Sequence, residues 1–154
     1  IRAVRPMTEN EYRVGGSTAL LDAIGRTIHK IGNAQKNTAD EYRAEKVMFV
    51  IITDGEENSS REYSYARVKS LVERQKAEYG WEFIFLGANM DAIRAASRFG
   101  IGADRAVDYI SDSEGTRLNF KVMSTTVARF RESGIVEDSC FEEIRDYVKR
   151  RRKK

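Results

Sequence analysis

"VMFVIITDG", residues 47–55, carries the clearest structural signal in this sequence. An unbroken apolar run from Val47 to Ile52 stops at Thr53-Asp54-Gly55 and gives way to acidic and hydroxyl side chains. A continuous apolar run is typical of a strand that is covered on both faces, and such strands belong to parallel sheets. The stretch therefore predicts a buried parallel strand that ends by presenting an aspartate on a turn.

The segments around this strand alternate between helical and extended patterns. Apolar residues recur at helical spacing from Leu20 to Ile31, and Gly32-Asn33 supplies the expected end of that helix. We also expect a short strand at 1–5, helices at 64–79, 89–99 (capped by Asn89), 114–132 and from 141 onward, and strands at 47–53, 81–86 and 105–109. Alternation of this kind predicts an α/β fold, with helices on both faces of a mainly parallel sheet.

Composition and charge exclude several classes of protein. The 154 residues suit one domain, and no apolar stretch approaches the roughly 20 residues that cross a bilayer. The single cysteine, Cys140, excludes an internal disulfide and a Cys-rich metal site, and the single histidine, His29, does not suit zinc chemistry that needs two or three imidazoles. The net charge is +3, but the last six residues, Lys149 to Lys154, are all basic, so the remainder is slightly acidic. We therefore do not expect a nucleic-acid-binding protein.

Asp54 is the first candidate functional residue. It follows the apolar strand directly, and in open parallel sheets ligands bind beyond the carboxyl ends of the strands. Gly55 allows the turn to stay tight, and a carboxylate oxygen there suits a hard cation such as Mg²⁺. The alternative is that Asp54-Gly55 is an ordinary turn dipeptide.

A second loop, Gly15-Gly16-Ser17-Thr18, leads into the first helix. Two glycines allow a close backbone approach, and two hydroxyls follow them. The alternative interpretation is that Ser17 is an ordinary helix N-cap. An N-cap accounts for one hydroxyl, however, and needs neither glycine.

Taken together, the two loops resemble a known family. "GGSTALLDAIG" and, about 30 residues later, "VIITDGEENSS" are similar to the second and third metal-site motifs of a von Willebrand factor type A domain, and "WEFIFLGANMDAIRAASRFGIGA" resembles its bacterial members. The resemblance implies a Rossmann-like, three-layer α/β/α fold. It also implies an adhesion site that holds Mg²⁺ or Mn²⁺, with Thr18 and Asp54 as metal ligands, Gly16, Ser17 and Gly55 in support, and a partner protein's carboxylate completing the shell.

The first motif of that family, Asp-x-Ser-x-Ser, is absent from this sequence. The resemblance therefore implies that residues 1–133 correspond to the C-terminal two-thirds of such a domain, without its N-terminal strands, followed by a C-terminal helix and basic tail over 134–154. Thr18 and Asp54 alone are too few to hold Mg²⁺ against its hydration shell. We expect the intact domain to bind the cation and this chain not to bind it firmly.

The function that this resemblance implies is metal-dependent protein binding, with no catalysis. An alternative is a metal-dependent phosphoryl-transfer enzyme using Asp54, although position 56 is Glu where a phosphotransferase of the haloacid-dehalogenase type has a second Asp. A third interpretation is a structural interaction domain with a vestigial site. Other polar groups have simpler interpretations: His29 as a solvated helix residue, Glu56 and Glu57 as capping or solvent-facing groups, and the basic run as a frayed helix end.

The strand at 47–53 also predicts how this chain associates with itself. If the neighbouring strand of the resembling fold is missing, an apolar edge is left unpaired, which predicts a homodimer through that edge. The dimer would form by antiparallel pairing of this strand or by exchange of segments. The alternative is a monomer in which Ile1–Arg5 fills the gap.

Without a signal sequence we expect a cytoplasmic protein, although a chain that begins at Ile1 leaves open a secretion signal upstream.

Overall fold

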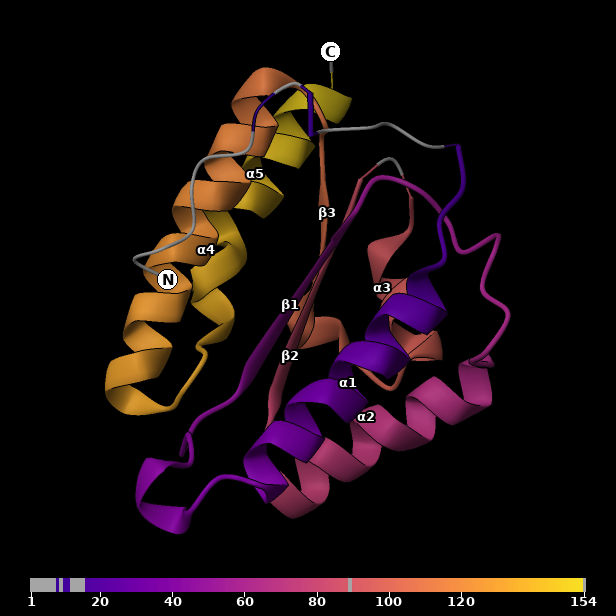
Figure 1. Cartoon of the computed structure of the whole chain (residues 1–154). Coiled ribbons are helices and arrows are strands. Elements are labelled where there is room, and N and C mark those ends of the chain that lie inside the picture. Colours follow the sequence, from indigo (N-terminus) through magenta and orange to yellow (C-terminus); the bar gives the residue numbers. More distant parts are fainter. Residues whose placement is uncertain (1–7, 9, 12–15, 89, 154) are drawn as a thin grey trace.

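The computed structural model describes residues 8, 10–11, 16–88 and 90–153, and Figure 1 shows the whole chain. Three strands lie between two groups of helices. In chain order the elements are α1 (Leu20–Lys36), β1 (Met48–Thr53), α2 (Tyr65–Tyr79), β2 (Glu82–Ala88), α3 (Ala92–Arg98), β3 (Ala106–Tyr109), α4 (Ser113–Ser133) and α5 (Glu142–Arg152), with 3₁₀ turns at Asp40–Tyr42, Ala103–Arg105 and Asp138–Phe141. The predicted strand at 1–5 lies outside the described residues.

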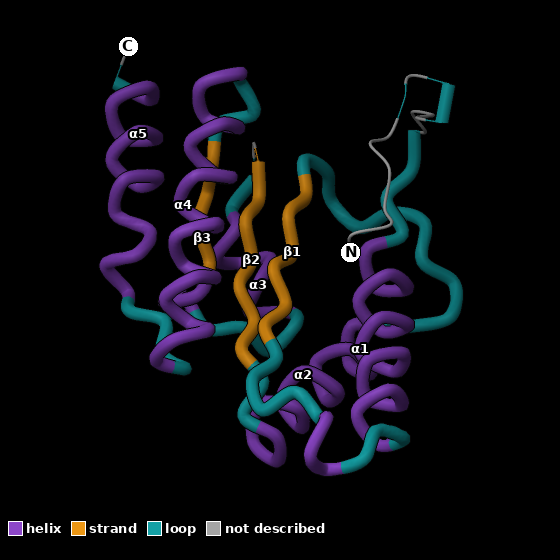
Figure 2. The backbone as a smooth tube through the Cα atoms, turned by 60° about the vertical axis from the view of Figure 1, so that its left-hand side comes forward, coloured by secondary structure: helices purple, strands orange, loops and turns teal. Residues whose placement is uncertain are grey.

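The sheet is parallel throughout, in the order β1-β2-β3. Phe49 pairs with Phe83 in the first ladder, and Phe85 pairs with Ala106 in the second. Helices cross between successive strands, which is why parallel pairing is possible at all. The structure confirms the predicted class: an α/β protein of Rossmann-like type with helices flanking a parallel sheet (Figure 2).

Each face of the sheet carries its own hydrophobic cluster. α1, α2 and α3 pack on one face of the sheet, where Ile28 of α1, Val72 of α2 and Phe85 of β2 belong to one buried cluster. α4 and α5 bury Ile84, Phe130 and others on the opposite face. Alternate residues of β2 enter opposite clusters, so this central strand is covered on both sides as the apolar run in its sequence predicts. Because Ile144 and Val148 belong to the second cluster, α5 packs as part of the same core as the sheet.

Helix ends depart from the sequence prediction in three places. α1 does not stop at Gly32-Asn33 but continues to Lys36, where the returning chain fastens it. The Gln35 amide donates to Ala44 O (2.7 Å), and Arg43 Nε donates to Gln35 O (2.8 Å). α3 is capped by Asp91, whose side chain accepts from Arg94 N (2.9 Å), while Asn89 lies outside the described residues. α5 remains helical to Arg152 rather than fraying.

β1 forms one side of the sheet (Figure 2). Among the residues the structure describes, its only strand partner is β2, so its other edge has no ladder. Burial reflects this position: Met48, Phe49 and Val50 are half-buried, and the Ile52 side chain is 42% exposed. The strand that reads as the most apolar in the sequence is therefore the least covered in the fold.

Candidate functional site

The two loops singled out in the sequence lie against each other at the carboxyl edge of the sheet. A Cβ added to Gly55 would lie 3.0 Å from Thr18 Oγ1, so the turn after β1 lies against Thr18, two residues before the start of α1. Thr53 shapes this turn, because its Oγ1 donates to Gly55 O (2.8 Å) and accepts from Gly55 N (3.3 Å). A larger residue at 55 would therefore press directly on the Thr18 hydroxyl.

Asn58 fixes the relative position of the two loops. Its backbone N–H donates to Thr18 O (3.1 Å), and its side-chain oxygen accepts from Thr18 N (2.8 Å). Because both polar groups of the Thr18 backbone are used, the backbone of Thr18 is held in place beside the turn. Asn58 had no role in the sequence prediction, and only its position four residues after Asp54 points to it.

Asp54 is exposed, and within the described ranges its carboxylate has neither a hydrogen-bond nor an ion-pair partner. Its charge nonetheless reaches the end of β3. Burial, followed by the negative charge of Asp54, raises the pKa of the Tyr109 hydroxyl. Thr18 Oγ1 likewise has no hydrogen-bond partner in the part of the chain that is described. The edge thus presents two oxygens, one charged and one neutral, whose acceptor capacity is unused.

Two carboxylates, the half-buried Glu57 and the buried Asp22, hold together the segments that form the site. Glu57 accepts from Leu21 N (2.8 Å) and from Ser60 N and Oγ (both 2.7 Å). Asp22 is 8% exposed and accepts three backbone N–H bonds, from Arg61 (2.9 Å), Glu62 (3.0 Å) and Tyr63 (2.9 Å). Together they tie the first turn of α1 to the segment that follows Asp54.

These bonds govern the ionisation of both carboxylates. The backbone N–H of Arg61, with those of Tyr63 and Glu62, holds the pKa of Asp22 below its ordinary value despite burial. Burial opposes the charge on Glu57, but the bonds from Leu21 and Ser60 outweigh it and lower its pKa as well. Hydrogen bonds to the charged form favour that form, so both groups are anions that serve the fold.

Two of the supporting residues of the predicted site, Ser17 and Gly16, make fewer contacts with the described residues than Thr18 and Gly55 do. Ser17 is not the N-cap of α1: the helix begins at Leu20, its cap position is Ala19, and Glu57 supplies the missing acceptor from across the loop. Gly16 is exposed, and a Cβ there would meet nothing within 4 Å. The prediction that Glu57 caps the segment following it is therefore incomplete, because it also caps the helix preceding β1.

A cavity of about 300 Å³ adjoins the turn. Gly55, Glu56 and Glu57 line one side of it, and α3 lines the other with Arg94 and Arg98. Arg98 lies over the Tyr65 ring at 3.6 Å from its centroid. Neither guanidinium has a carboxylate within ion-pairing distance among the residues that are described. The edge therefore combines free carboxylate oxygens with unpaired cations a short way along the surface.

Other residues considered in the sequence have structural partners. His29 Nδ1 lies 3.0 Å from Gly25 O and 2.8 Å from Tyr63 Oη, and Cys140 is a half-buried thiol. Arg151 pairs with Asp112 (3.0 Å), and Arg152 pairs with Asp108 (2.8 Å). Much of the basic run is thus engaged with the body of the protein, which corrects its interpretation as a frayed end.

Over residues 8, 10–11, 16–88 and 90–153, no group of three or more His, Cys, Asp or Glu side chains is arranged to hold a metal ion. In the same part of the chain, none of the helices has the length and apolar character required to cross a membrane.

Comparison with protein-family models, with curated proteins and with solved structures finds no match to this chain.

Proposed function

We propose that this chain contributes to a metal-ion-dependent protein-binding site, in which Thr18 and Asp54 supply oxygen ligands to Mg²⁺ or Mn²⁺. The observation that carries the proposal is the contact between the Thr18 hydroxyl and the Asp54-Gly55 turn, two segments 36 residues apart in the sequence. Hydroxyl and carboxylate oxygens are the ligand types that these hard cations prefer. A carboxylate from a partner protein would complete the coordination.

The described residues fit such a cation only in part. They offer Thr18 and Asp54 at the edge, whereas Mg²⁺ demands near-octahedral geometry and gives up water reluctantly. The remaining ligands of the proposed site come from outside the described residues. In this proposal the described residues position the two ligands. Asn58 holds the Thr18 backbone, Gly55 permits the close approach of the turn to Thr18, and Thr53 shapes that turn.

Two arginines without an ion pair in the described part of the chain support an acidic partner. Arg94 and Arg98 line the cavity beside the turn, so a partner segment carrying a second carboxylate would meet positive charge there. Complementary charge of this kind accelerates encounter and selects among partners. Glu56, which is exposed on the opposite side of that cavity, would disfavour a partner whose acidic groups approach from the wrong direction.

Calorimetric titration with Mg²⁺ and Mn²⁺ tests the proposal. We expect no tight binding by this chain alone, and binding by a version to which a segment carrying Asp-x-Ser-x-Ser has been added. In that version Asp54→Ala and Thr18→Val should abolish binding, while Glu56→Ala, the matched control, should retain it. Cation binding that survives Asp54→Ala would overturn the assignment.

The alternative of phosphoryl transfer by Asp54 makes a different prediction in the same proteins. It requires hydrolysis of an activated phosphate ester, lost in Asp54→Asn and measured as release of the coloured leaving group. The protein-binding proposal expects no such turnover, with or without Mg²⁺.

A further inference from the structure

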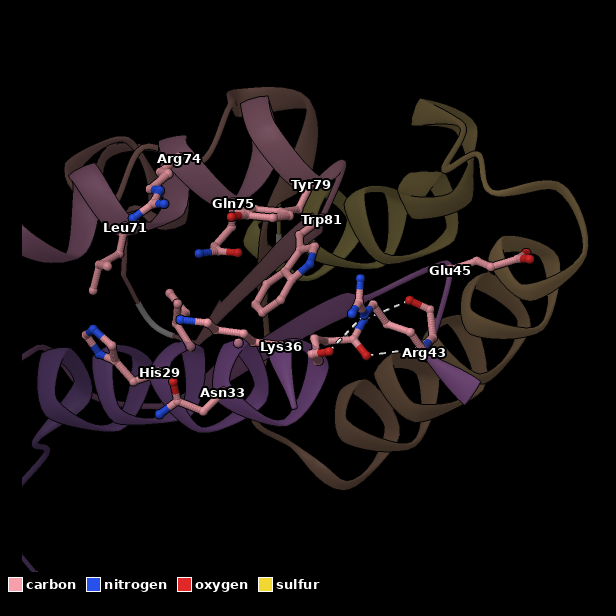
Figure 3. Close-up of a pocket in the computed structure, with 14 residues that line it drawn as sticks. His29, Asn33, Lys36, Arg43, Glu45, Leu71, Arg74, Gln75, Tyr79 and Trp81 are labelled. Carbon is pink, nitrogen blue, oxygen red and sulfur yellow. Dashed lines mark hydrogen bonds between the residues drawn. The ribbon is translucent and has the colours of Figure 1, made fainter. Parts of the chain in front are cut away.

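A larger cavity lies at the other end of the sheet, away from Thr18 and Asp54. It measures about 710 Å³ and opens between α1 and α2, next to Trp81 at the start of β2 and residues 43–45 just before β1 (Figure 3). Small-molecule sites typically occupy roughly 300–1,000 Å³. The proposed protein-binding function makes no use of this cavity.

The wall of the cavity is partly aromatic and is formed by closely packed side chains. Trp81 lies between the two helices, stacked on Phe49 with ring centroids 5.4 Å apart, and its backbone N–H donates to Gln75 O (3.1 Å). Ile28 from α1 and Leu71 from α2 add aliphatic surface on either side. A ring placed here would pack against side chains that are already fixed, so little conformational entropy is lost on binding.

Two polar groups reach into this apolar space. Gln75 is 9% exposed, yet its side-chain amide has no hydrogen-bond partner within the described ranges. The amide is not among the fully enclosed unpartnered groups of the described residues, so its polar atoms open onto the cavity and can bond to a ligand or to water there. Lys36 extends along the cavity from the last turn of α1 (Figure 3), and in the part of the chain described here it makes no ion pair.

The charge balance of the lining favours an anion. Arg43 and Arg74 also line the cavity, but they are paired with Asp40 (2.8 Å) and Glu78 (2.9 Å). The exposed carboxylate of Glu45 is the acidic group on the lining. One ammonium that has no ion pair among the described residues, with one amide on the same lining, matches a group with a single negative charge. A polyphosphate would need several unpaired cations.

We propose that this cavity binds a small aromatic carboxylic acid. Its ring packs against Trp81 and Leu71, its carboxylate pairs with Lys36, and the Gln75 amide donates a hydrogen bond to the same carboxylate. The site is separate from the edge that carries Thr18 and Asp54, so its occupancy does not depend on a metal.

Trp81 is the only tryptophan in the chain, which makes its fluorescence a local reporter of the cavity. The probe is phenylpropionate, and phenylpropanol is its neutral counterpart. We expect phenylpropionate to change the Trp81 emission in a saturable way at millimolar concentrations. Phenylpropanol should bind about tenfold more weakly, since it lacks the charge-assisted bond.

Variants locate the site and control for folding. Lys36→Met keeps the aliphatic stem and should weaken phenylpropionate binding about tenfold, without affecting phenylpropanol. Lys30→Met, an exposed position on the same helix that does not line the cavity, is the matched control and should bind normally. Gly32→Leu, whose side chain would enter open space on the lining, should block both probes.

Calorimetry and circular dichroism accompany each titration. The proposal is overturned if phenylpropionate produces neither heat nor a change in Trp81 emission up to millimolar concentration. It is also overturned if folded Lys36→Met binds the acid as well as Lys30→Met does, because the charge would then play no part.

Discussion

Asn119 lies in α4 with 2% of its surface exposed, and neither polar atom of its amide has a hydrogen-bond partner within the described part of the chain. A buried polar group without a partner costs about 1–3 kcal/mol. Asn119→Leu removes the amide at similar size, so we expect it to raise the free energy of unfolding by about that amount. Urea denaturation followed by circular dichroism measures the change.

Thr126→Val is the matched control for this prediction. Thr126 is equally buried on the same helix, but its hydroxyl donates to Val122 O (2.9 Å) and is therefore satisfied. We expect little or no stabilisation from that change. A loss of stability in Asn119→Leu would mean that the amide has a partner in solution.

Glu57 links stability to pH. Because its pKa is lower in the folded state than in the unfolded state, its carboxylate stabilises the fold fully above about pH 4.5. That contribution disappears as the pH falls through the folded-state pKa. Glu57→Gln should therefore lower the free energy of unfolding by about 1–3 kcal/mol at neutral pH, and by progressively less in acid.

Glu56→Gln is the comparison for that titration, because Glu56 is an exposed neighbour whose carboxylate accepts no backbone bond from the residues that the structure describes. Denaturant midpoints recorded across the acid range for both variants decide the point. An equal loss at neutral and acidic pH would show that Glu57 acts through packing and not through its charge.

Replacing two glycines of α1 by alanine should change stability in opposite directions. A Cβ on Gly25 would overlap the ring of Tyr63, whereas one on Gly32 would meet nothing within 4 Å. Gly25→Ala should cost about 1–3 kcal/mol through overpacking. Gly32→Ala should gain up to about 1 kcal/mol from helix propensity. Thermal unfolding of the two variants, side by side, checks both signs; stabilisation by Gly25→Ala would contradict the close approach of Tyr63.

The sequence predicts elements well where local pattern determines them. The strand at 47–53, the helix at 64–79 and the parallel class all follow from apolar runs and periodicity, and the structure has them within a residue or so. The contact between the Thr18 and Asp54 loops follows from the rule that ligands gather at carboxyl ends of parallel strands.

Long-range hydrogen bonds are what the sequence does not reveal. Asp22 reads as an ordinary acidic residue in the first turn of a helix, yet it holds backbone groups 39 to 41 residues away. The extension of α1 past Gly32 likewise depends on Gln35 meeting Ala44 from the returning chain. Periodicity has no access to such pairs, because each partner is unremarkable within its own segment.

The edge of β1 that has no ladder partner among the described residues predicts self-association of the whole molecule. An apolar edge strand without a ladder partner is a template for pairing with another chain. Light scattering coupled to size-exclusion chromatography should give the mass of a dimer, formed by antiparallel pairing of β1 or by exchange of segments. A monomer at micromolar concentration would contradict both and favour the alternative in which Ile1–Arg5 covers the edge.

The structure indicates which residue to change in that experiment. Phe49 stacks on Phe83 as well as Trp81, so a charge there would disrupt the core. Ile52 is 42% exposed, and Ile52→Lys should give a folded monomer because edge lysines block pairing. Ile135→Lys, at an exposed position beyond the end of α4, should leave the dimer intact.

The fastening of α1 at both ends has a consequence for the order in which the protein opens. Glu57 and Asn58, which follow β1, bond to the first turn of the helix and to Thr18, two residues before it. Gln35 bonds to Ala44 at the other end of the helix, just before β1 begins. The helix therefore has no free end from which to unwind. In native-state hydrogen exchange, amides in the last turn of α1 should be as slow as those at its centre. As denaturant rises, the exchange of α1 and β1 should merge into one common opening.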